Sequence, residues 1–159
     1  MKICFVCQGN IIRSPLAENI FRHLAEKRGL SGKYQLDSAG TSAYHVGEKP
    51  DRRMRQVAAD HGFEYSGRAR QFIREDLDDH DLIVVMDKNN LRILEGMARS
   101  ETQSKKIRMM REFDPQGSGD LDVPDPYYGG LEGFEVTFQI VKRSSEGLLE
   151  ELESGRFTD

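Results

Sequence analysis

Apolar residues along the chain follow two kinds of pattern: short runs, and stretches in which they recur every three or four positions. The short runs predict strands, over residues 2–7, 34–38, 82–86 and 106–110. The helical spacing predicts helices, over residues 14–27, 51–60 and 88–98 and from Leu131 onward, with a short helical turn over 75–80. Residues 111–130 are rich in glycine, proline and aspartate and predict a long loop.

Strands that alternate with helices indicate right-handed crossover connections, and therefore a parallel sheet. The sequence predicts an α/β fold in which a doubly wound, four-stranded parallel sheet carries helices on both faces. Since the chain has 159 residues and shows no repeat and no linker, one domain over residues 1–159 is expected. Ligands of such sheets bind beyond the carboxyl ends of the strands, so a site is expected at that edge.

The loop between the first strand and the first helix has the spacing Cys-x5-Arg-Ser, from Cys7 to Ser14. A loop in this position collects backbone N–H groups, and the helix dipole adds positive potential, so the loop suits an oxyanion. Gly9 permits close approach of the backbone to a ligand, and Asn10 tolerates a left-handed conformation. Ser14 is the expected N-cap of the helix.

Cys7 and Arg13 give this loop its predicted chemistry. The guanidinium of Arg13 offers a fork for a phosphate-like dianion, and the positive surroundings favour the thiolate form of Cys7. The loop therefore predicts a nucleophilic sulfur directly beneath a bound oxyanion. The alternative for this pair is a buried structural cysteine beside a surface arginine.

Composition narrows the classes of function. The net charge of −4 argues against a general nucleic-acid binder. The longest apolar run, over residues 82–86, is far too short for a membrane span. The first residues begin directly as a strand, without the pattern of a signal peptide. Two cysteines three residues apart do not resemble a secreted disulfide framework, so a cytoplasmic protein is expected.

Two separate motifs resemble those of one family. Residues 6–16, which include Cys7 and Arg13, resemble the active-site loop of low-molecular-weight protein tyrosine phosphatases. Residues 125–129, Asp-Pro-Tyr-Tyr-Gly, are similar to the general-acid loop of that family. Further family landmarks follow in the right order, at residues 37–41, 69–71 and 86–87. The resemblance covers nearly the whole chain and implies the phosphotyrosine phosphatase I-like fold.

The resemblance implies a phosphatase that needs no metal and no cofactor and removes phosphate from protein phosphotyrosine and small aryl phosphates. Cys7 would attack phosphorus to form a cysteinyl-phosphate, Arg13 would hold the phosphate, and Asp125 would act as general acid and then as general base. The residues expected to bind phosphate or substrate are Gln8, Gly9, Asn10, Ile11, Ile12, Ser14, Tyr44, Tyr127 and Tyr128. The tyrosines are expected to line a deep cleft with the phosphate at its bottom, which the long side chain of phosphotyrosine reaches and the shorter side chain of phosphoserine does not.

The expected partners are phosphotyrosine-containing proteins, with a tyrosine kinase as one candidate, and neither nucleic acid nor a membrane. The expected state is a monomer or a weak dimer. The histidines at positions 23, 45, 61 and 80 show no ligand spacing with acidic residues or cysteines, so no metal site is expected. His45 is an additional candidate for contact with the substrate.

Two positions depart informatively from the family pattern. Ile12 stands where most members have a second cysteine that can form a disulfide with the nucleophile. Cys4 does not replace it, because three steps along an extended strand place its α-carbon about 10 Å from that of Cys7, beyond the limit of about 7 Å for a disulfide. Cys4 is therefore expected in the core. Gly67 stands where the family has a histidine that braces the loop, and Ser38 is the candidate replacement.

Two aspartates invite other interpretations. Asp-Pro pairs are common in turns, and Asp114-Pro115 is a second such pair in the same predicted loop as Asp125. Asp125 is preferred as the acid because two tyrosines follow it. Asp87, at the end of the third strand, is expected either to brace Arg13 or to cap the next helix.

Several rival functions share parts of this pattern. A thioredoxin-coupled arsenate reductase needs further cysteines to relay a disulfide, and none follows Cys7. A protein-arginine phosphatase typically has threonine at the position of Ile11. A cysteine phosphoryl carrier must protect its phosphocysteine from water, which Arg13 and Asp125 would oppose, and a silent phosphotyrosine-binding module would not need all three groups. Hydrolysis of phosphotyrosine is the favoured interpretation.

Overall fold

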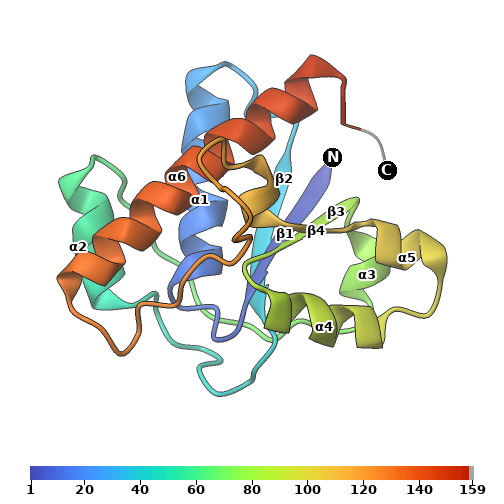
Figure 1. Cartoon of the computed structure of the whole chain (residues 1–159), viewed down its shortest axis with the longest axis horizontal. Helices are drawn as coiled ribbons and strands as arrows, with labels where there is room; N and C mark the ends of the chain where they lie inside the picture. The colour runs from blue at the N-terminus through green and yellow to red at the C-terminus, as the bar shows by residue number, and fades with distance from the viewer. Residues whose placement is uncertain (158–159) are drawn as a thin grey trace.

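The computed structural model describes residues 1–157 and contains one four-stranded sheet surrounded by helices (Figure 1). The strands are β1 (Lys2–Cys7), β2 (Gln35–Gly40), β3 (Leu82–Val85) and β4 (Ile107–Met109). The helices are α1 (Arg13–Lys27), α2 (Arg52–Asp60), α3 (Asp76–Asp79), α4 (Lys88–Met97), α5 (Glu101–Lys105) and α6 (Leu131–Ser154), with a 3-10 helix η1 (Met110–Phe113). No helix within residues 1–157 combines the length and apolar character that a membrane crossing requires.

The sheet is parallel, with the strand order β2-β1-β3-β4. Because β2 lies on one side of β1 and β3 on the other, the connections diverge at the carboxyl end of β1, the point at which such sheets bind ligands. Cys7 is the last residue of β1 and pairs with Gly40 at the end of β2. The predicted nucleophile therefore lies at the ligand-binding edge of the sheet.

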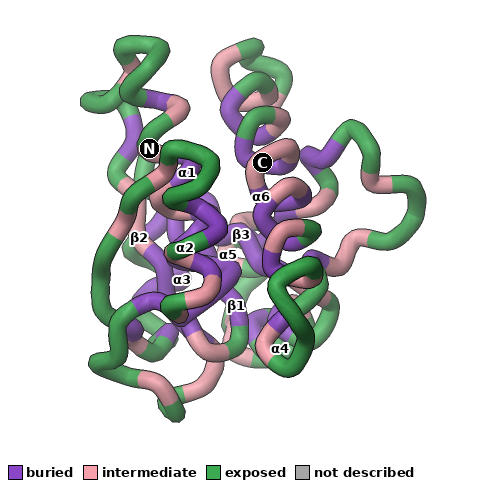
Figure 2. The backbone as a smooth tube through the Cα atoms, turned by 90° about the vertical axis from the view of Figure 1, so that its left-hand side faces the viewer, coloured by how far each residue is buried: buried purple, intermediate pink, exposed green. Residues whose placement is uncertain are grey.

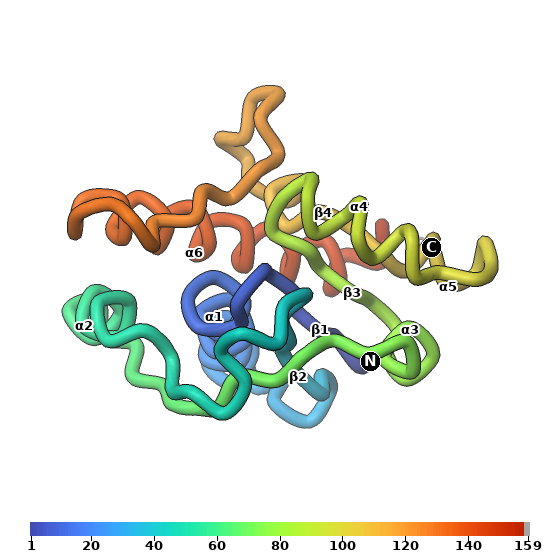
Figure 3. Tube along the Cα trace, turned by 90° about the horizontal axis from the view of Figure 1, so that it is seen from below, coloured from blue at the N-terminus to red at the C-terminus, as the bar shows by residue number. Residues whose placement is uncertain are grey.

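Alternate residues of β1 point to opposite faces of the sheet and join two hydrophobic clusters. Ile3, Phe5 and Cys7 belong to the larger cluster, with α1, α2 and α6. Cys4 and Val6 belong to the smaller cluster, with α3 and α4. Figures 1 and 3 show the two groups of helices on opposite sides of the sheet, and Figure 2 shows the buried residues concentrated along the strands and the inner sides of the helices. The predicted α/β architecture with helices on both faces is confirmed.

Some element boundaries differ from the prediction. α1 begins at Arg13 instead of Ser14, with Ile12 at the N-cap and no side-chain cap hydrogen bond. α5 was not predicted, since it has five residues and buries none of them, so no apolar spacing marks it. η1 covers the end of a predicted strand and the start of the predicted loop, where it buries Met110 and Phe113.

Candidate active site

The loop that joins β1 to α1 curls around the sulfur of Cys7. Asn10 has the left-handed backbone conformation that the sequence predicts, with φ of 56°. Its backbone N–H donates to Cys7 Sγ over 3.3 Å. Backbone N–H groups of such a loop, together with the positive end of α1, provide an anion-binding concavity at the sulfur.

Ser14 faces the sulfur and does not cap its helix, so its predicted capping role is wrong. Since α1 already starts at Arg13, Ser14 lies inside the first turn, fully buried beside the end of β2. Its hydroxyl lies 3.1 Å from Cys7 Sγ and accepts a hydrogen bond of 2.8 Å from Asn10 Nδ2. The hydroxyl donates to the backbone carbonyl of Ala39 over 3.3 Å, and rotation about its C–O bond directs the same proton to a Cys7 thiolate.

The side chain of Asn10 braces the loop from behind. Its Nδ2 donates to Ser38 Oγ over 3.0 Å as well as to Ser14, and its Oδ1 accepts from the backbone N–H of Arg70 over 2.9 Å. Ser38 in turn donates to Glu18 over 2.7 Å. Ser38 therefore contributes to the bracing, as expected for a chain that has glycine at position 67.

Arg13 is held in place by acceptors on two other loops. Its Nη1 donates to Asp87 Oδ2 over 2.7 Å and to the backbone carbonyl of Val123 over 2.9 Å. Burial alone would lower the pKa of Arg13, but the negative charges of Cys7, Asp87 and Asp125 raise that pKa above its ordinary value. Asp87 has both roles that were considered for it, because its Oδ1 also accepts the backbone N–H of Asn90 at the start of α4.

Asp125 and Asp114, the two Asp-Pro aspartates of the loop, have different environments. Asp125 lines the same cavity as Cys7, its Oδ2 lies 3.5 Å from Arg13 Nη2, and its side chain is 42% exposed. Asp114 is fully buried and accepts hydrogen bonds from Arg143 and Arg111. Burial would raise the pKa of Asp114, but these arginines hold it below the ordinary value. Asp114 is thus committed to a structural ion pair, whereas Asp125 is available to a ligand.

Twelve residues surround a cavity of about 350 Å³ above Cys7. They are Cys7, Gln8, Gly9, Ile11, Ile12, Arg13, Ser42, Tyr44, His45, Asp125, Tyr127 and Tyr128. Asn10 and Ser14 are the predicted site residues that lie behind the cavity without lining it. The cavity therefore brings together the remaining predicted groups, from three separate segments of the chain.

Aromatic side chains form the rim of this cavity. Tyr44 is 83% exposed and Tyr128 is 96% exposed, while Tyr127 is half-buried. The ring of His45 contacts that of Tyr44 at 4.7 Å between centroids and lies 6.1 Å from that of Tyr127. A Cβ atom on Gly9 would lie 3.0 Å from His45 Cδ2, so glycine leaves room for this ring. Exposed rings around a polar floor suit a ligand that is aromatic at one end and anionic at the other.

Three further residues shape the site and were not predicted. A Cβ atom on Gly40 would approach the backbone oxygen of Gln8 to 2.7 Å, so β2 can pass the loop only with glycine there. Ser42 lines the cavity and donates its backbone N–H to Gln8 O over 2.9 Å. Arg53 of α2 donates to the backbone carbonyl of Tyr127 over 3.1 Å and so holds the loop of residues 125–129. Gly40 and Ser42 lie in or next to the recognised stretch 37–41, whereas no sequence signal marks Arg53.

Cys4 lies on the opposite face of the sheet from Cys7. Both cysteines are free thiols, so the expected absence of a bond between them agrees with the structure. Cys4 is fully buried in the smaller hydrophobic cluster, and burial raises the pKa of its thiol. The core position predicted for Cys4 is confirmed.

A buried thiol beside an arginine, with an acid across the cavity and a Cys-x5-Arg loop at the carboxyl edge of a parallel sheet, is characteristic of cysteine-dependent phosphatases. The sequence profile of the family described as "Low molecular weight phosphotyrosine protein phosphatase" matches residues 2–156. The chain therefore belongs to this family, and it is a protein-tyrosine phosphatase.

Individual relatives agree with this assignment. A low molecular weight protein-tyrosine-phosphatase of Streptomyces coelicolor is 47% identical over 149 residues, which are 93% of this chain and 91% of the relative. The crystal structure of a protein tyrosine phosphatase from Entamoeba histolytica, with Hepes in its active site, superposes with a TM-score of 0.94 at 38% identity and covers 99% of both chains. DARP, described as a Drosophila arginine phosphatase, superposes with a TM-score of 0.89 at 34% identity and covers 98% of this chain and 99% of its own.

Proposed function

We propose that Cys7, Arg13 and Asp125 hydrolyse phosphotyrosine in proteins, and small aryl phosphates, through a cysteinyl-phosphate. The observation that carries this assignment is the shared cavity, in which Asp125 Oδ2 lies 3.5 Å from Arg13 Nη2 and both residues line the wall with Cys7. The proposed nucleophile Cys7, the phosphate-binding Arg13 and the proton donor Asp125 therefore all line the same cavity. A phosphoryl group held by Arg13 has room for attack on one side and for a leaving group on the other.

In the first step, the Cys7 thiolate attacks phosphorus and the bond from phosphorus to the tyrosine oxygen breaks. Asp125 gives its proton to that oxygen, so tyrosine leaves as a neutral phenol. Arg13 and the backbone N–H groups of residues 8–13 hold the three equatorial phosphate oxygens as charge moves among them. The product of this step is a thiophosphate on Cys7.

In the second step, the Asp125 carboxylate takes a proton from a water molecule, which attacks phosphorus. The bond from sulfur to phosphorus breaks, inorganic phosphate forms, and Cys7 leaves as a thiolate. Ser14 Oγ, 3.1 Å from the sulfur, donates a hydrogen bond that stabilises this leaving group. The cycle ends with Asp125 protonated again and needs no redox partner.

The aromatic rim favours phosphotyrosine over shorter phosphorylated side chains. Tyr44, Tyr127 and Tyr128 line the cavity above the phosphate loop, so a phosphate at the loop must be carried on an arm long enough to pass them. A phosphotyrosine ring can pack against these rings as it descends. The proposed partners are phosphotyrosine-containing proteins, a tyrosine kinase among them, acted on by a monomer or weak dimer. A cytoplasmic location suits a nucleophile that must stay reduced.

Phosphoarginine is the second candidate substrate, because the Drosophila arginine phosphatase has nearly the same backbone arrangement. The side chain of Ile11 lines the cavity and is buried, so it offers an apolar contact beside the phosphate loop. An apolar wall suits the carbon edge of a phenol ring better than a charged guanidinium, which loses hydration there. This contact favours phosphotyrosine.

The choice between these substrates is tested with matched peptides that carry phosphotyrosine, phosphoserine or phosphoarginine at one position. We expect kcat/KM for phosphotyrosine to exceed that for each of the others by on the order of 10²-fold or more, equivalent to about 2.7 kcal/mol. Release of inorganic phosphate without added metal is the measurement. A higher kcat/KM for phosphoarginine would reverse the substrate assignment while leaving the roles of the three catalytic groups intact.

Ser14→Ala tests the second step specifically. Loss of the hydroxyl beside the sulfur is expected to lower kcat by about 10- to 100-fold, since a hydrogen bond to a charged group contributes about 1.5–3 kcal/mol. Phosphoenzyme is expected to accumulate. Rapid quench with a substrate whose phosphoryl group is radiolabelled measures the amount that is formed. Ser145→Ala is the matched control, because Ser145 is equally buried, has no hydrogen-bond partner among residues 1–157, and lies in α6, outside the site. Equal rates for both variants would remove Ser14 from the mechanism.

A further inference from the structure

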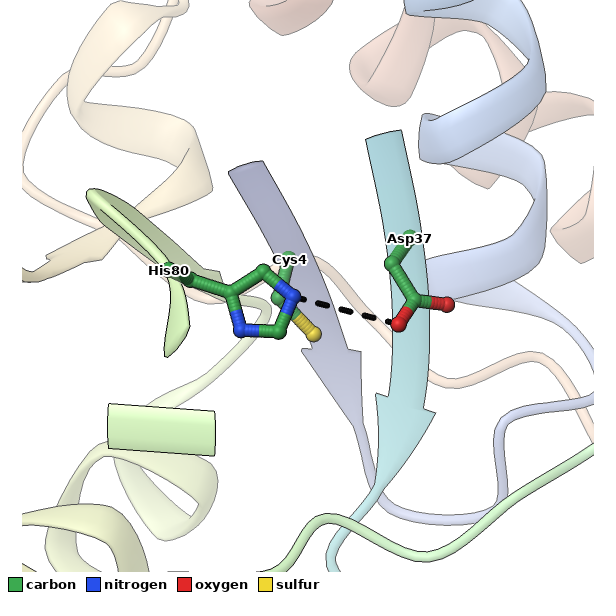
Figure 4. Close-up of side chains that lie close together, drawn as sticks. All are labelled: Cys4, Asp37 and His80. Atoms are coloured by element: carbon green, nitrogen blue, oxygen red, sulfur yellow. Dashed lines mark ion pairs between the residues drawn. The ribbon is translucent and has the colours of Figure 1, made fainter. Parts of the chain in front are cut away.

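A second cluster of reactive side chains lies on the face of the sheet opposite Cys7. Cys4 of β1 and Asp37 of β2 are direct neighbours in the parallel register, and His80 follows α3 just before β3. Figure 4 shows the three side chains pointing toward one another. Cys4 Sγ, a carboxylate oxygen of Asp37 and a ring nitrogen of His80 all lie within 4.8 Å of one another. These are three of the side-chain types that bind transition metals in proteins.

The ring of His80 is oriented with one nitrogen facing Asp37. His80 Nδ1 lies 3.0 Å from the backbone carbonyl of Asp76, and since a carbonyl only accepts, Nδ1 carries the proton. In the neutral ring the lone pair is then on Nε2, which faces Asp37 Oδ2 across 3.8 Å. This distance is too long for a hydrogen bond. His80 Nε2 thus faces an oxygen that already accepts from Arg70, and His80 Nδ1 lies 3.7 Å from Asp76 Oδ1. A backbone carbonyl fixes the ring, as it commonly does for metal-binding histidines.

The charges around this gap leave a net negative charge. Arg70 contacts all the acidic groups here: its Nη2 lies 2.7 Å from Asp37 Oδ2 and 3.8 Å from Cys4 Sγ, and both terminal nitrogens lie 3.0 Å from the oxygens of Asp76. One guanidinium therefore faces two carboxylates and neutralises only one of them. A divalent cation that binds while Cys4 loses its proton brings the sum to zero. The metal takes the place of Arg70 Nη2 beside Cys4 Sγ and Asp37 Oδ2, and Arg70 Nη1 keeps its hydrogen bond to Asp76.

We propose that Cys4 Sγ, Asp37 Oδ2 and His80 Nε2 bind one zinc-like transition-metal ion, with water in the fourth position. A thiolate, an imidazole and a carboxylate form a donor set that suits Zn²⁺ or Co²⁺, whereas Mg²⁺ and Ca²⁺ prefer oxygen atoms alone. The proton of Cys4 passes to solvent as the bond from sulfur to the metal forms. The ligand atoms, now up to 4.8 Å apart, must approach one another by about 1 Å to reach tetrahedral distances.

An ion has access to the site from the edge of the sheet. β2 is an edge strand, and the side chain of Asp37 is 47% exposed, while Cys4 and His80 are buried behind it. The site is separate from the catalytic cavity but close to its support, because the backbone N–H of Arg70 donates to Asn10 in the phosphate loop. Spacing along the sequence gives His80 no ligand partners, because Cys4 and Asp37 reach it from distant segments.

The test uses the full chain with Cys7→Ser, so that the catalytic sulfur cannot bind the metal. Titration with Co²⁺ is expected to produce a thiolate-to-cobalt charge-transfer absorption that saturates at one ion per chain, and Zn²⁺ is expected to abolish it by competition. Mg²⁺ and Ca²⁺ in excess should leave it unchanged. Adding Cys4→Ser should remove the band, and adding His80→Gln or Asp37→Asn should weaken Co²⁺ binding at least about tenfold.

His61→Gln in the same background is the matched control, because His61 also pairs with a carboxylate, Glu135, but lies outside the cluster. It should bind Co²⁺ with unchanged affinity. Thermal melting with chelator present checks that each variant is folded. If a replacement at buried Cys4 or His80 unfolds the chain, Asp37→Asn still tests the site, because the side chain of Asp37 is half-exposed. Absence of the band, its persistence with Cys4→Ser, or equal affinity in folded Asp37→Asn would overturn the proposed site. The readout is binding, so it stands or falls independently of the catalytic mechanism.

Discussion

Cys7→Ser is expected to abolish hydrolysis of p-nitrophenyl phosphate, with a fall in kcat on the order of 10⁴-fold or more. The serine hydroxyl keeps the shape of the side chain, but an alcohol holds its proton far more tightly than a thiol does, so the attacking atom is a much weaker nucleophile. Cys4, the other thiol, lies on the opposite face of the sheet and cannot reach the phosphate loop to replace it. The measurement is steady-state release of p-nitrophenolate without added metal.

The same variant should keep its fold and its ability to bind phosphate. Serine is slightly smaller than cysteine, and the backbone N–H groups and Arg13 that receive the anion are unchanged. Thermal melting should therefore be close to that of the parent, and inorganic phosphate should raise the melting temperature of both proteins. If Cys7→Ser turned over substrate at the parent rate, covalent catalysis at this position would be excluded.

Asp125→Asn is expected to lower kcat by about 10²- to 10⁴-fold for substrates with a poorly stabilised leaving group, such as phenyl phosphate or phosphotyrosine. The amide has no acidic proton to give to the departing oxygen and cannot deprotonate the attacking water. The loss in the first step should be smaller for p-nitrophenyl phosphate, because p-nitrophenolate leaves without a proton. A plot of log kcat/KM against leaving-group pKa should therefore be nearly flat in the parent and steep in the variant.

Asp120→Asn is the control for this experiment. Asp120 belongs to the same loop as Asp125, but its side chain is 71% exposed and does not line the cavity. Its replacement should leave both the rate and the leaving-group dependence unchanged. A flat plot for Asp125→Asn would show that another group protonates the leaving oxygen, and His45, which also lines the cavity, would be examined next.

The phosphate loop could be predicted well from the sequence because its determinants are local. β1, the loop and α1 are contiguous, so apolar spacing, Gly9 and the left-handed Asn10 define them without help from distant residues. The capping role of Ser14 was wrong for a tertiary reason. The helix already begins at Arg13, so Ser14 lies within its first turn, where the hydroxyl contacts Ala39 O of β2 and Cys7 Sγ instead of the helix start.

The identity of the acid was less certain from the sequence, because Asp114-Pro115 and Asp125-Pro126 are locally alike. Their difference arises from partners elsewhere in the chain. Arg143 of α6 and Arg111 of η1 bury and neutralise Asp114, whereas Asp125 extends over the phosphate loop toward Arg13. Within residues 111–130 the two tyrosines after Asp125 point to the right aspartate, but nothing there shows that arginines bury Asp114. Arg53, which holds the loop of residues 125–129, was not predicted because its partner Tyr127 is far away along the chain.

The sequence by itself determined the strand and helix order, the loop that surrounds the sulfur, and the family. These depend on spacing along the chain, which hydrophobic periodicity and short motifs record directly. Only the tertiary structure decided what neutralises Asp114, what Ser14 contacts, and that Cys4, Asp37 and His80 meet on the far face of the sheet. Those outcomes depend on the strand order β2-β1-β3 and its register, which bring side chains from distant segments within a few ångströms of one another.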